Sequence, residues 1–211
     1  MKRRTQLRFV DLARRWPPLT ALVNAGGQHR AASMLAEFSA WLPPRGGRVL
    51  DIGTGTGHVA AAVSARGGAV VGCDVVDLRV AVVRFVLGDG GALPFRSGGF
   101  DAALLITVLH HVPAVQHDRL LAEALRVLKV GGRLVLFEDT YHNHIERRVT
   151  AWQDSAMNLE VAGHPHSNRP LADWRRVLAG LGGVIRHERE FVAWYGLFRV
   201  RHGLLIVERP V

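Results

Sequence analysis

The chain has 211 residues, of which 48% are hydrophobic and 21% charged, close to the usage of ordinary globular domains. This length suits one large domain, or one domain with a small cap, and the composition excludes a disordered or fibrous chain. The apolar runs fall short of the roughly 18 to 20 residues that cross a bilayer. The single cysteine, Cys73, excludes an internal disulfide and a cysteine-rich metal site. We therefore expect a soluble, cytoplasmic protein.

Positive charge exceeds negative charge, with 27 lysines and arginines against 18 aspartates and glutamates and a net charge of +9. Two interpretations stay open. The excess could serve a polyanionic partner, because arginine binds phosphate in a bidentate manner. Alternatively, arginine fills ordinary solvated cation positions. The arginines are spread along the chain, which favours the second interpretation, and only residues 2–15 contain a cluster.

Three zones follow one another along the chain. Residues 1–47 contain two stretches with helical spacing, 9–16 and 31–42, each followed by a proline pair, and they predict an N-terminal helical cap. From residue 48 to about 138, short apolar strands alternate with helices. The predicted strands are 48–52, 69–73, one within 81–87, 100–107 and 133–138, and the predicted helices are 58–66 and 118–129. Such alternation predicts a parallel sheet with helices on both faces.

The third zone begins with a polar connector at residues 139–170, which holds four of the eleven histidines. An apolar stripe from Ile145 to Leu159 predicts a helix inside this connector. A further helix at 171–181 and strands at 184–190 and 197–207 complete the chain.

A glycine-rich turn joins the first strand to the following helix. Its glycines are Gly53, Gly55 and Gly57, a spacing that lets a ligand approach backbone amides at a helix N-terminus. A dinucleotide-binding turn would place its third glycine where His58 stands, and no Walker lysine follows. The alternative is a tight turn that binds no ligand.

The turn resembles motif I of the class I S-adenosylmethionine-dependent methyltransferases, and more specifically of the small-molecule, type 11-like family. Four further segments resemble that family in the same order. The five segments are Val49-Leu-Asp-Ile-Gly-Thr-Gly-Thr-Gly57, Val70-Val-Gly-Cys-Asp74, Leu87-Gly-Asp-Gly-Gly-Ala-Leu-Pro-Phe95, Phe100-Asp-Ala-Ala-Leu-Leu-Ile-Thr-Val-Leu-His-His-Val112 and Arg126-Val-Leu-Lys-Val-Gly-Gly-Arg-Leu-Val-Leu136. Val130 replaces the proline that the family usually has.

This resemblance implies an α/β fold. We expect a Rossmann-like, doubly wound, seven-stranded and mostly parallel sheet with an antiparallel C-terminal strand. The helical cap would occupy residues 1–47 and the methyltransferase domain residues 48–211, with the histidine-rich connector at 139–170 forming part of the acceptor region.

The resemblance also implies S-adenosylmethionine as cofactor, S-adenosylhomocysteine as product, and a binding site at the carboxyl ends of the strands. Asp51 would face the ammonium or sulfonium, Asp74 both ribose hydroxyls and Val75 the adenine ring, while Asp89 and the Gly90 amide would meet the adenine amino group. The backbone of Gly53, Thr54, Gly55 and Gly57 would approach the ligand, and Thr107 would lie near the transferred methyl group. Asp74 and Asp89 could instead be plain turn residues.

One departure concerns the interval between Asp74 and Asp89, which is only fifteen positions long. The family usually fits a helix there, whereas residues 75–84 have room for little more than a short turn. We therefore expect a more open adenine side.

The histidines are the candidates for a general base, which is needed only if the acceptor must lose a proton. His111, which follows the fourth strand directly after His110, and His142 in the connector are our candidates. Three interpretations of the connector histidines stay open: a polar acceptor site, solvated loop residues, or ligands of a divalent metal. They are His142, His144, His164 and His166. We assign no metal site.

The function we expect is methyl transfer to a small molecule by in-line displacement. An RNA or DNA methyltransferase is one alternative, although the segment Thr107-Val-Leu-His110 lacks the catalytic motif of amino-methylating nucleic-acid enzymes. A non-catalytic binding module is another alternative. The basic N-terminus is expected to form a lid that meets an anionic acceptor or an anionic membrane surface.

Overall fold

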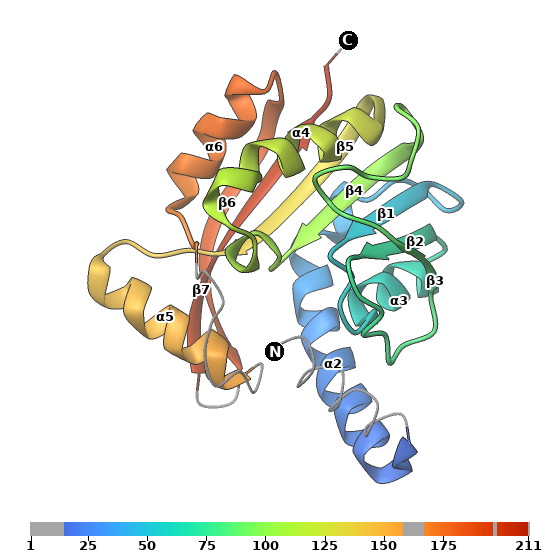
Figure 1. The fold of residues 1–211 in the computed structure, drawn as a ribbon, viewed down its shortest axis with the longest axis vertical. Helices are drawn as coiled ribbons and strands as arrows, with labels where there is room; N and C mark the ends of the chain where they lie inside the picture. Colours follow the sequence, from blue (N-terminus) through green and yellow to red (C-terminus); the bar gives the residue numbers. More distant parts are fainter. Residues whose placement is uncertain (1–14, 158–166, 196–197, 211) are drawn as a thin grey trace.

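The structure is a computed structural model that describes residues 15–157, 167–195 and 198–210. Its centre is a seven-stranded sheet with the order β3-β2-β1-β4-β5-β7-β6 (Figure 1). The strands are β1 (Arg48–Ile52), β2 (Ala69–Asp74), β3 (Arg84–Leu87), β4 (Phe100–Ile106), β5 (Leu128–Asp139), β6 (Val184–Tyr195) and β7 (Phe198–Glu208). The described helices are α2 (Pro17–Phe38), α3 (His58–Ala65), α4 (His117–Val127), α5 (His144–Met157) and α6 (Leu171–Gly180). Short 3-10 turns span Ser39–Trp41, Leu109–His111 and Ala114–Gln116.

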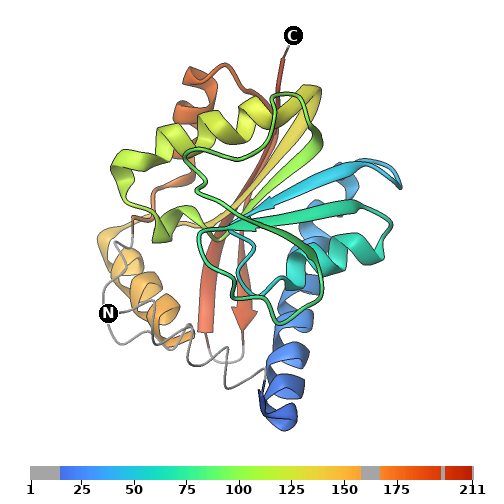
Figure 2. The same cartoon turned by 45° about the vertical axis from the view of Figure 1, so that its right-hand side comes forward.

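The strand pairing confirms the predicted sheet. Strands β3, β2, β1, β4 and β5 pair in parallel, and β7 runs antiparallel to both β5 and β6. Because the parallel strands point the same way, the ends of β1, β2, β4 and β5 lie along one edge of the sheet (Figure 2).

Helices cover both faces of the sheet. On one face, α4 and α6 pack through Leu121, Leu125 and Trp174 against inward residues of β4, β5 and β7. On the other face, α2 and α3 pack through Phe38 and Val63 against the opposite residues of the same strands. The strands are apolar on both sides for this reason, and the edge where they end is left for polar residues.

Several element boundaries differ from the sequence-based expectation, among them the end of β6, which continues to Tyr195 instead of residue 190. Pro17 and Pro18 begin a 22-residue helix, because proline fits the first turn of a helix, where its missing N–H is not needed. The helix continues through Gly27, where a Cβ would lie 2.4 Å from the His58 ring, so this glycine permits close packing of α2 on α3. Strand β5 begins at Leu128, five residues before the expected start, and helix α4 ends correspondingly early at Val127.

The expected helix at residues 9–16 lies almost wholly outside the described residues. The segment between β2 and β3 contains no helix, which confirms the short connection inferred from the spacing of Asp74 and Asp89. No helix within the described ranges has the length and apolar character that crossing a bilayer requires.

Candidate active site

The glycine-rich turn folds over the end of β2 and brings two aspartates together. The Thr54 hydroxyl donates to Asp51 at 2.6 Å, and the Gly55 amide donates to the Asp74 carboxylate at 3.0 Å. The Gly53 amide donates to the carbonyl of Cys73 at 2.8 Å, which fixes the turn to its neighbouring strand. The structure therefore assembles one polar cluster from residues that the sequence places 23 positions apart, from 51 to 74.

The three glycines of the turn serve two different purposes. All have positive φ, with values of 73° at Gly53, 49° at Gly55 and 83° at Gly57. A Cβ at Gly53 would lie 2.6 Å from Val108, and one at Gly57 would lie 3.3 Å from Val83, so both positions serve packing. At Gly55 the nearest atom would be 4.0 Å away, so the space in front of it is open. Gly55 is the position at which a ligand can reach the backbone.

Asp51 is buried, with 3% of its surface exposed. The pKa of its carboxyl is raised to about 7, mainly by burial and also by the negative charge of Asp74, while the hydrogen bond from Thr54 partly lowers it. A buried carboxylate that has lost most of its hydration gains most from a nearby cation. Its environment therefore suits an ammonium or sulfonium group.

Asp74 is oriented by two backbone amides, those of Gly55 and Val76, the latter at 3.3 Å. The end of β3 lies beside it, since the Gly88 amide donates to the Asp74 carbonyl at 2.9 Å.

Asp89 directly follows Gly88 and accepts a hydrogen bond from the Gly91 amide at 2.8 Å, so it also shapes a turn. Burial, with the charges of Asp74 and Asp89, raises the pKa of the Cys73 thiol to about 11, which places these carboxylates around one acidic end of the sheet. Val75 lies beside Asp74 with its side chain exposed.

The exit of β4 is strained. Thr107 has a φ of 55°, the only positive value among the described non-glycine residues, and its amide donates to the carbonyl of Phe137 at 2.7 Å. A β-branched residue in this conformation costs of order 1 to 3 kcal/mol and persists only where its surroundings hold it.

Glu138, which the sequence analysis did not identify, holds this exit from the neighbouring strand β5. Its carboxylate accepts the amides of Val108 and Leu109, each at 2.6 Å, and contacts His110 Nδ1 at 2.8 Å. The Glu138 side chain is buried, so these three contacts replace its lost hydration. The one available signal was its place beside Asp139, two acids at the end of an otherwise apolar strand.

The two neighbouring histidines differ in access. His110 is buried against Glu138, whereas His111 is half-buried and packs against the His110 ring, with the centroids 4.0 Å apart and the ring planes tilted by 48°. His111 is thus the more accessible imidazole at the exit of β4.

His142 is not brought to this exit. It is exposed, and its Nε2 lies 2.8 Å from Glu190 on the outer strand β6. His144 lies on α5, while His164 and His166 lie outside the described residues. Within the described part of the chain, no three histidine, cysteine or acidic side chains are grouped as metal ligands.

A second buried pair lies next to Glu138. Asp139 contacts His202 Nδ1 of β7 at 2.9 Å. Burial would raise the pKa of Asp139, but the hydrogen bond and charge of His202, with smaller contributions from His110 and Arg30, hold it down at about 2. Two carboxylate–imidazole pairs therefore stabilise the end of β5.

A doubly wound sheet with a glycine-rich β1–α3 turn and an acid at the end of β2 defines a Rossmann-like α/β class of protein. Residues 50–136 match the family model described as a methyltransferase domain. The demethylmenaquinone methyltransferase of Tropheryma whipplei is 37% identical over 176 residues, which cover 75% of this chain and 70% of that protein. That of Thermobifida fusca is 42% identical over 143 residues, which cover 62% of this chain and 58% of that protein.

Solved structures share the fold at low identity. A putative methyltransferase of Bacillus halodurans has a TM-score of 0.69 at 21% identity, with 85% of this chain and 100% of that chain covered. A Burkholderia thailandensis 1,6-didemethyltoxoflavin-N1-methyltransferase has a TM-score of 0.62 at 17% identity, with coverages of 88% and 79%.

The chain belongs to the class I S-adenosylmethionine-dependent methyltransferase family. It spans only part of several curated relatives, with alignments covering 57%, 63% and 55% of the length of three of them.

Proposed function

We propose that the protein transfers a methyl group from S-adenosylmethionine to a small-molecule acceptor. The observation that carries this proposal is the cluster of Asp51, Gly55 and Asp74 at the carboxyl ends of β1 and β2. Because relatives of the chain are named demethylmenaquinone methyltransferases, the hydroquinone form of demethylmenaquinone is the first acceptor to test. A cytoplasmic location stays a prediction.

The residues present fit this cofactor. The Asp74 carboxylate, already oriented by backbone amides, would accept the ribose hydroxyls, and buried Asp51 would face the ammonium or sulfonium. The open space at Gly55 leaves room for the ligand beside the backbone, with Gly53, Thr54 and Gly57 holding the turn in shape. Val75 would lie against the adenine ring, and Asp89 with the Gly90 amide would meet its amino group. When bound, the cofactor supplies an electrophilic methyl group on a sulfonium.

The chain's own contribution to the reaction is alignment. In-line displacement requires the acceptor atom to be held close to the methyl group and on its far side, and correct positioning can supply much of the acceleration. The strained Thr107, whose amide donates to Phe137, and the two following amides, which donate to Glu138, form a rigid wall at the exit of β4. A rigid wall fixes this geometry better than a mobile loop would.

Proton removal is assigned to His111. A hydroquinone must lose a hydroxyl proton for its ring carbon to become nucleophilic, so a general base is useful. His111 stands at the exit of β4 with its ring supported by His110, whereas His142 is turned toward Glu190. His142 would contribute only with an acceptor that extends to β6.

The cofactor half of the proposal is tested by calorimetry with S-adenosylhomocysteine. We expect micromolar affinity for the unaltered protein and at least a tenfold loss for Asp74→Asn, because the lost carboxylate charge weakens two hydrogen bonds. Asp118→Asn, at an exposed position in the first turn of α4, is the control and should change affinity less than threefold. Absence of heat with either S-adenosylmethionine or S-adenosylhomocysteine would refute the proposal.

The acceptor half is tested separately by transfer of a labelled methyl group to a short-chain demethylmenaquinol. Transfer that disappears in His111→Ala, with cofactor affinity retained, would support the assignment. Cofactor binding without transfer would remove this acceptor, and salt-sensitive transfer to RNA instead would favour the nucleic-acid alternative.

A further inference from the structure

Over residues 144–153, helix α5 has the reverse of the usual amphipathic arrangement. Its inward side is polar: Thr150 and Gln153 are buried, and Glu146 is paired with Arg201 of β7 at 3.2 Å. The Asn143 side chain accepts the amides of Ile145 and Glu146 at 3.0 and 2.9 Å, which caps the helix. The helix is therefore attached to the domain through polar contacts, whereas surface helices usually bury their apolar side.

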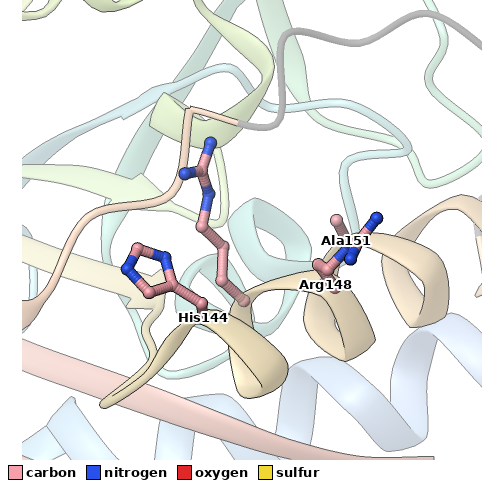
Figure 3. A pocket seen from close by; sticks show the side chains of 4 residues that line it. His144, Arg148 and Ala151 are labelled. Carbon is pink, nitrogen blue, oxygen red and sulfur yellow. The ribbon is translucent and has the colours of Figure 1, made fainter.

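The outward side of α5 carries the apolar residues. Ile145, Val149 and Trp152 are 76%, 44% and 65% exposed, and their spacing of four and three residues aligns them in one stripe. Arg147 and Arg148, which lie between Ile145 and Val149 in the sequence, are also exposed. Together with His144 and Ala151 these arginines line a hollow of about 450 Å³, and Figure 3 shows the labelled members along one side of the helix.

We propose that α5 docks on the surface of an anionic lipid bilayer. The stripe would enter the boundary between headgroups and acyl chains, and Arg147 and Arg148 would bind lipid phosphates, with one phosphate seated in the hollow. Tryptophan and arginine side by side on a helix whose apolar face is open to solvent are typical of helices that lie in the bilayer interface. Over residues 144–153 of α5, Glu146 is the only acidic side chain, and it is already paired with Arg201, which leaves Arg147 and Arg148 as the exposed charges of this stretch.

A second copy of the chain is a poorer candidate than a bilayer for covering the exposed side of α5. A two-fold dimer would place Arg147 and Arg148 of one copy close to the same residues of the other, which costs free energy. The stripe has only three apolar side chains, well short of the ~800 Å² per partner that a stable interface buries. Binding to a bilayer requires less buried apolar area, because every anionic headgroup adds attraction to the arginines.

The position of α5 suits this task. It follows β5 after a four-residue connection, at the same edge of the sheet as Thr107 and Asp74. A bilayer bound to α5 would face the edge from which an acceptor approaches. This last link rests on the proposed function and on a lipid-soluble acceptor, whereas docking itself does not.

Vesicle flotation tests the docking in the absence of cofactor and acceptor. The full chain is mixed with vesicles of phosphatidylcholine alone or with one third phosphatidylglycerol, at rising salt. We expect binding only to the anionic vesicles and a steep decrease with salt. The double variant R147Q/R148Q should lose roughly 25-fold in partition coefficient, since each arginine at the surface contributes about a factor of five.

The matched control is R175Q/R176Q, an adjacent arginine pair exposed on α6. It makes the same change in net charge on another helix and should lose less than threefold. W152A should also weaken binding while leaving its salt dependence in place, because it removes apolar contact only.

Equal losses in the two double variants would overturn the proposal, because they would show attraction by overall charge alone. Absence of binding to anionic vesicles would overturn it too, as would a concentration-dependent dimer that W152A dissociates. Cofactor affinity, measured without vesicles, reports on the proposed function independently of all these outcomes.

Discussion

Replacement of Asp51 by asparagine should stabilise the cofactor-free protein and at the same time weaken cofactor binding. The carboxyl of Asp51 has its pKa raised to about 7 from an ordinary 3.8. In the unfolded chain it ionises near the ordinary value, so between these two values the stability of the folded state falls as pH rises. Above pH 7 the full penalty is present, on the order of 4 kcal/mol. An asparagine that keeps the hydrogen bond from Thr54 avoids this penalty.

Urea denaturation at pH 5.5 and pH 8 measures the effect. From the same pKa values, Asp51 should lower the stability of the unaltered protein by on the order of 2 kcal/mol between these pH values. Histidines also titrate in this range, so the quantity to compare is the difference between the protein and Asp51→Asn, which cancels their contribution. The variant should be the more stable of the two by a margin that grows from pH 5.5 to pH 8.

Cofactor affinity should change in the opposite direction. A cation prefers the ionised carboxylate, so affinity for S-adenosylmethionine, which carries both the ammonium and the sulfonium, should rise up to tenfold per pH unit below pH 7 and level off above it. Asp51→Asn should bind weakly at every pH. A variant that is less stable than the unaltered protein at pH 8, or that binds with an unchanged pH profile, would refute the assignment of Asp51 as the buried partner of a cation.

Two other predictions concern the walls of the site. Glu138→Ala should lower the free energy of unfolding, measured by urea denaturation, by on the order of 3 to 5 kcal/mol, because it leaves the amides of Val108 and Leu109 without acceptors. Glu138→Gln should lower it by about 1 kcal/mol. The glutamine variant should also slow methyl transfer at unchanged cofactor affinity. Equal stability of the two variants would show that the carboxylate does not hold the exit of β4. Gly53→Ala should destabilise the fold by more than about 2 kcal/mol because its Cβ meets Val108, whereas Gly55→Ala should cost about 1 kcal/mol and act mainly on cofactor affinity in calorimetry. If Gly55→Ala left that affinity unchanged, the open space there would not be the ligand position.

The sheet could be predicted because its strands are short apolar runs bounded by glycines and acids. Arg48–Ile52 and Ala69–Asp74 are bounded in this way, and both were located to within one residue. The predicted ends of helices and strands were wrong where tertiary packing determines them. Gly27 lies inside α2 because His58 packs against it, and the start of β5 at Leu128 depends on pairing with Phe100. Neither contact leaves a local signal in the sequence.

Asp51 and Asp74 could be predicted for the same reason as the strands, since each stands where an apolar run ends at the glycine-rich edge. Glu138 could not, because its role depends on the pairing of β4 with β5, which brings it to amides about thirty positions earlier in the chain. That pairing also distinguishes His110 from His111, the imidazole that the sequence already favoured as a candidate base. Glu138 holds His110 in the interior, and His110 in turn carries the ring of His111 toward the exit of β4. The proposal of His111 rather than His110 as the base therefore rests on a carboxylate of another strand.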